Sequence, residues 1–225
     1  MDISSLWHIR SLSDTYSSIP CVSTDVRQLT TRNSPVGLHE LLYSMDSRSP
    51  VQAPCTTVEQ ITTIRELVRA LLREPDPSEY GTVLERCNIS ARFLEPYYRW
   101  NGKHYTRSCI HRNANFELLV ICYEPGQGTS IHDYDSQTAW IHPVMGEVIE
   151  ERYTVNEQGL QLELEKHLSP GTPDVLREGS AIHRFVNPGP ERSATLNLYA
   201  KPLSKWRVYD PGTGAPSIAV PGSAA

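Results

Sequence analysis

Residues 126–146 read GQGTSIHDYDSQTAWIHPVMG, and this stretch decides how the chain is expected to fold. Gly126 and Gly146 bracket it, and glycine at such positions is typical of turns that separate short strands. His132 and Tyr134 are two residues apart, so in a strand their side chains point to the same side. Ala139 follows five residues after Tyr134 and begins another apolar run. The stretch therefore predicts strands that direct one imidazole and one phenol into the interior of a β-structure.

Short apolar or alternating runs continue on both sides of this stretch, from about Tyr105 onward. Turn sequences rich in Gly and Pro separate them, namely PGQG, NEQG, SPGTP and NPGP. Many short strands at close spacing favour a small antiparallel β-barrel or a double-sheet jelly roll. The runs are FELLVICY, TAWIHPVM, EVIEERYTV, LQLELEKHL, AIHRFV and SATLNLYA.

Helices are predicted before the strands. Thr57 followed by Gln60 forms a capping box, and apolar residues then recur at helical spacing until the prolines that follow residue 74. Shorter helices are predicted at residues 78–86 and 91–94. The expected fold class is thus mainly β, a barrel or jelly roll with two or three N-terminal α-helices packed on it.

The first quarter of the chain differs from the rest in composition. Residues 1–54 are rich in Ser, Thr, Pro, Asp and Arg and show no sustained period. This composition is typical of a segment that is partly disordered or lies over the surface of a domain. We therefore expect an N-terminal extension over residues 1–54 and the folded domain, with its helices, over residues 55–225.

Charge and hydropathy exclude several classes of partner. The 225 residues include 21 Lys plus Arg and 26 Asp plus Glu, for a net charge of −5. A mildly acidic chain has no electrostatic reason to bind nucleic acid or an anionic membrane. The apolar runs are too short to span a bilayer, and the start MDISSLWHIR lacks the basic and apolar regions of a secretory signal. The sequence predicts a cytoplasmic protein with neither a nucleic-acid nor a membrane partner.

A second block of residues complements the first. Gly179, His183 and Asn187 recur at intervals of four, about 35 residues further along the chain. Together the two blocks resemble the paired motifs of the cupin superfamily, in which Gly-x5-His-x-His and a later His lie on strands of one barrel. Neutral imidazoles on rigid strands suit a mid-series divalent metal with open coordination positions. The resemblance implies a cupin-type barrel with a metal site.

Further motifs make the resemblance more specific. Tyr105-Thr-Arg107, the run GQGTSIHDY and the tail LNLYAKPLSKWRVYDPGTG resemble cysteine dioxygenase, the thiol dioxygenase branch of the cupins, from about Thr57 to Gly214. In that family, iron held by three His binds cysteine, and dioxygen is added to sulfur to give cysteine sulfinate. The resemblance implies one divalent transition metal and no organic cofactor. Fe(II) is the expected ion, with Ni(II) or another ion as the alternative.

The resemblance also assigns residue roles. His132 and His183 match metal ligands. Arg107 matches the arginine that grips the substrate carboxylate, a task suited to the fork of a guanidinium group. Tyr105 lines the same pocket, and Tyr199 matches the tyrosine whose hydroxyl faces the reacting sulfur and oxygen atoms. Arg107 and Tyr199 are thus the expected catalytic residues.

Three positions depart from the family pattern. Tyr134 replaces the second metal His, and three roles are open for it: a metal ligand, a neighbour of a two-His site completed by water, or an inert aromatic in a dead site. Ala139 replaces the cysteine that some members cross-link to Tyr199. Asn197 replaces the relay His; we expect it to bind substrate, although it cannot titrate near neutral pH as His does. His142 is a substitute donor only in principle, because strand alternation turns it to the opposite face.

Two functions from different classes follow. The first is metal-dependent oxidation of the sulfur of L-cysteine or a close thiol amino acid by dioxygen, giving either the sulfinate or a rearranged, sulfonamide-type product with a sulfur–nitrogen bond. The second is a non-catalytic cupin that binds a metal or a thiol metabolite. The expected partners are the thiol and dioxygen, with the protein a monomer or a small homo-oligomer.

Overall fold

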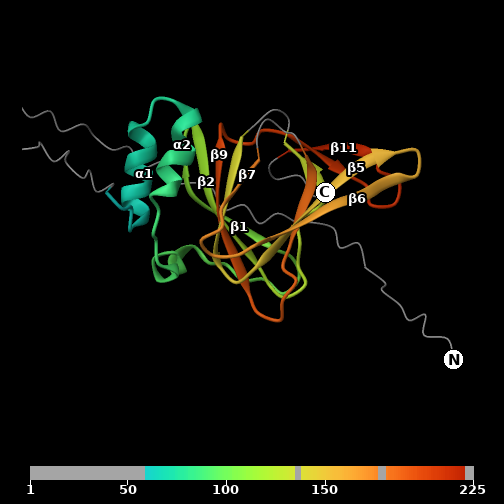
Figure 1. The fold of residues 1–225 in the computed structure, drawn as a ribbon, viewed down its shortest axis with the longest axis horizontal. Helices are drawn as coiled ribbons and strands as arrows, with labels where there is room; N and C mark the ends of the chain where they lie inside the picture. Colours follow the sequence, from blue (N-terminus) through green and yellow to red (C-terminus); the bar gives the residue numbers. More distant parts are fainter. Residues whose placement is uncertain (1–58, 135–137, 177–180, 221–225) are drawn as a thin grey trace, which may run out of the picture.

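The computed structural model describes residues 59–134, 138–176 and 181–220. Two antiparallel sheets face each other at its centre (Figure 1). The five-stranded sheet has the order β1-β2-β9-β4-β7, and the six-stranded sheet has the order β11-β10-β3-β8-β5-β6. The strands are β1 (Thr106–Arg112), β2 (Phe116–Tyr123), β3 (His132–Asp133), β4 (Ala139–Met145), β5 (Val148–Asn156), β6 (Gly159–Leu168), β7 (Asp174–Leu176), β8 (Ile182–Val186), β9 (Ser193–Ala200), β10 (Trp206–Tyr209) and β11 (Pro216–Ala219).

The inner faces of the two sheets enclose one hydrophobic core, which we call the inner core. Its buried members come from both sheets, as Ile121 of β2, Ile141 of β4 and Phe185 of β8 illustrate. Alternate residues of each strand point into it because the side-chain period of a strand is two. The predicted mainly β fold, in which antiparallel sheets enclose a core, is thereby confirmed.

Two short α-helices cover the outer face of the five-stranded sheet: α1 (Ile64–Arg73) and α2 (Tyr80–Glu85) (Figure 1). Their apolar faces and the outward side chains of β2, β4 and β9 form a second cluster, the outer core. At its centre the ring of Tyr80 makes edge contacts with Phe116 and Trp140 at centroid distances of 5.7 and 6.0 Å. The connecting 3₁₀ turns are Pro77–Glu79, Ala91–Phe93 and Glu95–Tyr97.

The start of the first helix differs from the prediction. Thr57 lies outside the described residues, but Ile61 is not helical, because its backbone is hydrogen-bonded to the segment that follows α2. A second capping box begins the helix instead: the Thr63 side chain accepts from the Glu66 N–H, and the Glu66 carboxylate accepts from the Thr63 N–H. Both sequences fit the capping pattern, and the tertiary bridge at Ile61 decides between them.

Gly146, which ends the first motif, forms the tight turn from β4 to β5. Its φ is +64°, and a Cβ atom there would lie 2.6 Å from the carbonyl oxygen of Arg192. Glycine is therefore required by conformation and by space.

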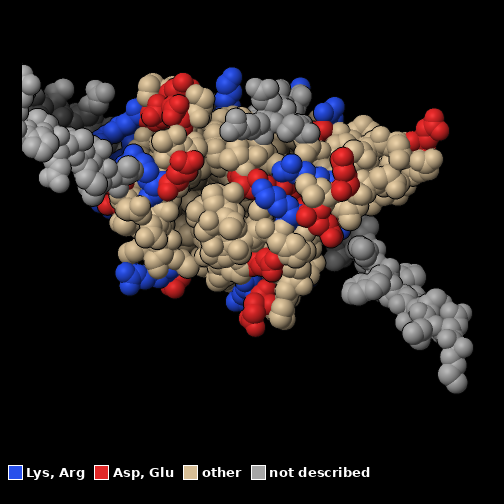
Figure 2. Space-filling model, in the orientation of Figure 1, with Lys and Arg blue, Asp and Glu red and all other residues tan. Residues whose placement is uncertain are grey.

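The outer surface mixes both signs of charge on the face shown in Figure 2, where acidic and basic side chains alternate over the described part. No helix among the described residues is long and apolar enough to cross a membrane. The predicted extension over residues 1–54 lies outside the described residues.

Candidate active site

Two histidines face each other on neighbouring strands inside the barrel. His132 of β3 lies directly opposite His183 of β8 in the strand register, and their ring centroids are 4.6 Å apart. Tyr134 follows β3 two residues after His132, and its ring lies 4.9 Å from His132 and 5.1 Å from His183. The structure thus brings together the three residues that the sequence predicted as metal donors.

The surroundings of His132 fix its tautomer. Its Nδ1 lies 2.7 Å from the carbonyl oxygen of Ser130. A carbonyl only accepts, so Nδ1 carries the proton and Nε2 keeps its lone pair. Burial lowers the pKa of His132 to about 4, and the nearby Arg107 contributes in the same direction. The imidazole is therefore neutral near pH 7 and able to act as a donor to a cation.

His183 is a buried imidazole whose polar atoms are unsatisfied. It is 1% exposed, and among the described residues neither ring nitrogen has a partner at good hydrogen-bond geometry, although the backbone of Ala181 is close enough for a weak interaction. Burial and the neighbouring His132 hold its pKa well below the usual value. Buried polar atoms without partners are rare in proteins and call for a ligand or a water molecule. An imidazole in this state fits a bound metal ion.

Among the described residues, no third His, Cys or carboxylate side chain joins this pair. The described residues contain no group of three such side chains able to hold a metal ion. An ion bound by His132 and His183 would therefore take its remaining donors from a residue of another type, from water or from substrate.

A row of hydrogen-bonding groups runs along β9 toward these rings. The Thr195 hydroxyl donates to Asn197 Oδ1 at 2.6 Å, and Asn197 Nδ2 donates to the Tyr199 hydroxyl at 3.5 Å. The Tyr199 and Tyr134 hydroxyl oxygens are 3.2 Å apart. Because Tyr199 accepts from Asn197, its own proton is directed to Tyr134 or to a ligand. Burial, reinforced by Tyr199, raises the pKa of Tyr134 well above its usual value.

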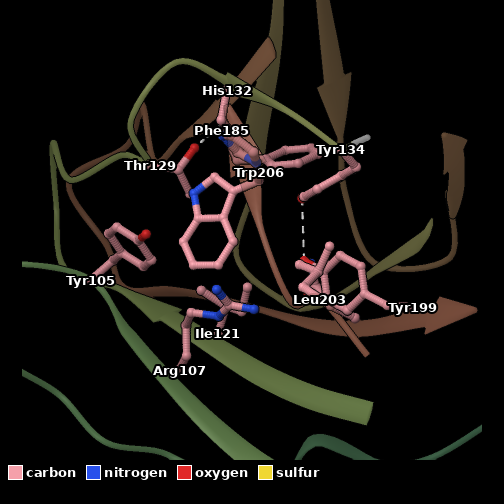
Figure 3. A pocket seen from close by; sticks show the side chains of 11 residues that line it. Tyr105, Arg107, Ile121, Thr129, His132, Tyr134, Phe185, Tyr199, Leu203 and Trp206 are labelled. Atoms are coloured by element: carbon pink, nitrogen blue, oxygen red, sulfur yellow. Dashed lines mark hydrogen bonds between the residues drawn. The ribbon is translucent and has the colours of Figure 1, made fainter. Parts of the chain in front are cut away.

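A pocket opens beside the rings, between the two sheets (Figure 3). It encloses about 360 Å³, including the space open to solvent. All of the predicted site residues line it except His183, which lies beside His132 and Tyr134 and takes no part in the pocket wall. The lining residues are Tyr105, Arg107, Ile121, Thr129, His132, Tyr134, Phe185, Asn197, Tyr199, Leu203 and Trp206.

Arg107 of β1 places a positive charge in the wall of this pocket. Its guanidinium carbon lies 6.0 Å from the ring centroid of Tyr199 and 5.9 Å from that of Trp206, within the range of cation–π attraction. Tyr105, just before β1, stacks on Tyr123 at 5.9 Å. The guanidinium group is thus placed among aromatic rings on the opposite side of the barrel from β3 and β8 (Figure 3).

Two further positions lie where strand alternation places them. Ala139 is directly opposite Tyr199 in the register of β4 and β9, so the position expected for a cross-link is adjacent to the tyrosine and carries only a methyl group. His142 is paired with Leu196, whose side chain belongs to the outer core, so this imidazole points away from His132 and His183.

Five residues of the pocket wall, four of them apolar, were not predicted from the sequence. Trp206 was within the tail that carried the family resemblance, so its large aromatic ring was the available signal. Ile121 and Phe185 left no comparable signal, because single apolar side chains in strands usually belong to the core. Thr129 and Leu203 lie within the quoted motif runs, but neither is a residue type that marks a site. The missed residues are Ile121, Thr129, Phe185, Leu203 and Trp206.

Comparisons with known proteins identify a family that this chain resembles. The family model described as Cysteine dioxygenase type I matches residues 45–212. Cysteine dioxygenase type 1 of Danio rerio is 23% identical over 74% of this chain and 85% of its own length, and the Bos taurus protein gives the same values. A solved structure of a conserved protein with a double-stranded β-helix domain from Klebsiella pneumoniae is 18% identical, covers 56% of this chain and 93% of its own, and has a TM-score of 0.42.

Proposed function

The chain belongs to the cysteine dioxygenase type I family, and on this premise we propose that it adds dioxygen to the sulfur of L-cysteine or a close thiol amino acid. Family membership makes it a cupin-type dioxygenase that uses a single transition-metal ion. The substrate, the ion and the residue roles are our proposal. It is carried by one observation: the His132–His183 pair lies beside a pocket that also contains Arg107 and Tyr199.

We assign His132 and His183 as metal donors, because both are neutral and, among the described residues, no well-formed hydrogen bond occupies the nitrogens of His183. Fe(II) is the proposed ion, since reaction with dioxygen needs a redox-active metal. When bound, the ion would offer open positions to thiolate and dioxygen and would supply redox chemistry. Ni(II) binds the same donors more tightly by the Irving–Williams order, so occupancy alone does not identify the working ion.

Tyr134 is the proposed third donor. Its ring lies about as far from each histidine ring as the histidines lie from each other, which supports a shared ligand among the three. Burial raises the pKa of this phenol, so ligation as phenolate requires the ion to offset the cost of deprotonation.

Arg107 is proposed to bind the substrate carboxylate. A guanidinium group presents a planar fork of donors that matches a carboxylate, and it keeps its charge at any physiological pH. Arg107 and His132 line the same pocket from opposite sheets, and His183 lies beside His132, so we propose that a short α-amino acid with a thiol spans the two positions. Tyr105 completes the wall beside Arg107.

Tyr199 and Asn197 are proposed to control a proton near the reacting sulfur. Asn197 donates to the Tyr199 oxygen and is itself fixed by Thr195, so the Tyr199 proton is oriented toward the pocket. We propose that this hydroxyl donates to the oxygen being transferred. Asn197 cannot exchange a proton near neutral pH, so it orients Tyr199 and does not relay protons.

The overall reaction balances without an external reductant. The thiol and one dioxygen molecule together contain every atom of the sulfinic acid, in which sulfur has lost four electrons and dioxygen has gained them. Because Tyr134 and Asn197 replace two histidines of the family pattern, the proposal includes an alternative product in which the substrate nitrogen bonds to the oxidised sulfur. Forming that bond breaks an N–H and an S–OH bond and releases water, and reaching the sulfonamide level removes two further electrons from sulfur, which a second dioxygen accepts.

Metal analysis combined with oxygen uptake tests this function. The purified protein should bind about one ion per chain and consume oxygen with L-cysteine after loading with Fe(II), and the metal-free protein is the control. Sulfur products are identified in the same samples. Absence of oxygen uptake with L-cysteine, L-homocysteine and cysteamine, under Fe(II) and Ni(II) alike, would instead support the non-catalytic cupin.

Restoring the family residue tests the altered product. Tyr134→His should give a third imidazole donor and shift the product of cysteine oxidation toward the sulfinate, because it replaces an oxygen donor or water at the ion. The product ratio of the variant is compared with that of the wild type. An active wild type whose products are the same as those of Tyr134→His contradicts a role for Tyr134 in directing the chemistry. The cytoplasmic location and the oligomeric state, a monomer or a small homo-oligomer, remain predictions.

A further inference from the structure

Trp206, the first residue of β10, is a large side chain in the wall of the pocket that neither its motif nor the proposed mechanism has assigned. It is 4% exposed, so its indole ring is held within the protein although it borders the pocket. Figure 3 shows the ring directed across the pocket toward Arg107. Its position therefore determines how much space remains near the guanidinium group.

Arg107 lies close to two aromatic rings, one from each sheet. Tyr199 belongs to β9 of the five-stranded sheet and Trp206 to β10 of the six-stranded sheet, and both ring centroids are about 6 Å from the guanidinium carbon. A flexible side chain in contact with two rigid rings loses alternative rotamers before any ligand binds. The indole thus fixes the position of the guanidinium group as well as the pocket wall.

The strand that carries Trp206 is tied to the strand that carries His132. Asp133, 2% exposed, receives Arg207 Nε at 3.0 Å and the Tyr209 hydroxyl at 2.7 Å, and a second guanidinium nitrogen of Arg207 lies 2.7 Å from it. These charge-assisted contacts hold β10 and β3 in register on the face opposite the pocket. The distance between the indole ring and the histidine pair is therefore set by a buried carboxylate.

We propose that Trp206 determines substrate size, by closing the pocket between Arg107 and the histidine pair, and positions Arg107 for the carboxylate. This inference rests on the proposed thiol oxidation at the same site. With the indole in place, the site accepts the span from carboxylate to sulfur found in L-cysteine and discriminates against L-homocysteine, which is longer by one methylene group. Pocket walls of this kind discriminate single methylene groups by roughly 10- to 200-fold.

The test compares Trp206→Leu, which removes the ring, with Trp206→Phe, which keeps a smaller ring. Trp100→Leu is the matched control, because Trp100 contacts Arg192 and does not line the pocket. Binding of L-cysteine, L-homocysteine and cysteamine to the Fe(II)-loaded full-length proteins is measured by calorimetry without oxygen. Metal content and kcat/KM with oxygen are measured in parallel.

Trp206→Leu should lower the preference for L-cysteine over L-homocysteine by about tenfold or more. It should also weaken L-cysteine binding by roughly 2- to 30-fold, as expected for loss of a cation–π contact, while cysteamine, which lacks the carboxylate, changes less than about twofold. Trp206→Phe should keep L-cysteine binding near the wild-type value and still admit more L-homocysteine. Trp100→Leu should behave as wild type.

Two results overturn the inference in distinguishable ways. If the wild-type protein binds L-cysteine and both Trp206 variants keep its preference over L-homocysteine, Trp206 does not determine size, and the proposed function is unaffected. If the loaded wild type binds none of the three thiols, the proposed function fails and the role of Trp206 fails with it. Should Trp206→Leu not fold, the preference measured in Trp206→Phe decides.

Discussion

The two faces of β9 lie in contrasting environments. Outward, Leu196 and Leu198 join the outer core beneath the helices, where the clustered side chains are apolar. Inward, Thr195, Asn197 and Tyr199 form a hydrogen-bonded row inside the barrel. Both faces are almost completely buried, so exposure does not distinguish them. One strand thus presents an apolar packing face to the helices and a polar, hydrogen-bonded face to the pocket.

The polar inner face is less favourable for stability than the apolar outer face. Burying a polar group is unfavourable unless it is hydrogen-bonded, and a half-satisfied network is less stable than an apolar core of the same shape. The inner core nevertheless contains two imidazoles of lowered pKa, and neither nitrogen of His183 makes a well-formed hydrogen bond among the described residues. Packing alone would favour apolar residues at these positions, which is the physical reason to assign them a ligand.

The largest expected effect tests the apolar face. Leu198→Ala should lower the free energy of unfolding by about 2–5 kcal/mol, because it leaves a cavity in the outer core. Urea unfolding measures this loss. Metal bound per folded molecule should stay as in the wild type, and Leu198→Met, which conserves volume, should cost less than about 1.5 kcal/mol. A loss of metal in Leu198→Ala at temperatures where it is folded would contradict the separation of the two faces.

The next effect concerns the charge that faces the pocket. Arg107→Ala should weaken L-cysteine relative to cysteamine by about 1.5–3 kcal/mol, the range for a hydrogen bond to a charged group. Steady-state kinetics with both thiols measures it. Arg112→Ala, on the same strand but ion-paired with Glu117, should affect both thiols equally. Equal losses of binding free energy for the two thiols in Arg107→Ala would show that Arg107 does not bind the carboxylate.

Replacing His183 should weaken metal binding. His183→Ala should lower metal affinity by roughly 10- to 100-fold or more, since one of two nitrogen donors is lost. His142→Ala is the matched control, because this imidazole lies on the opposite face of its strand. Competition with a chelator gives both affinities. Equal metal affinity in the two variants would refute the assignment of His183.

The smallest expected effect concerns the hydrogen bonds that hold Tyr199 in place. Thr195→Val removes the hydroxyl that fixes Asn197, and it should lower the free energy of unfolding by about 0.5–1.5 kcal/mol. Thr82→Val, which removes a hydroxyl hydrogen-bonded to Glu79 at the surface, should cost less than about 0.5 kcal/mol. Thermal or urea unfolding compares the two. A larger loss from the surface threonine would contradict the importance of the buried row.

Alternation along the strands made much of this arrangement predictable. A period of two places His132 and Tyr134 on one face and turns His142 away, and the structure agrees at each position. The start of α1 was not predictable in the same way. The local sequence fits a capping box at Thr57 and another at Thr63. The helix begins after Thr63 because the backbone of Ile61 is bridged to Cys87, a contact that local patterns do not predict.

The meeting of distant residues required information that local patterns lack. That His132 lies directly opposite His183 depends on the register between β3 and β8, which the intervening loops and pairings determine. Trp206 begins a strand of only four residues, too short for a period to assign its face. The family resemblance supplied the histidine pairing but gave no role to the tryptophan.

β3 is only two residues long, and its register comprises two residue pairs with β10 and a single pair with β8. Segments with so few backbone hydrogen bonds open locally at lower free energy than the rest of a sheet. A ligand held by both imidazoles would cross-link β3 to β8 at their weakest junction. Occupancy of the site would then slow hydrogen exchange of the backbone amides around His132, so that the ligand acts as a structural brace for the sheet that binds it.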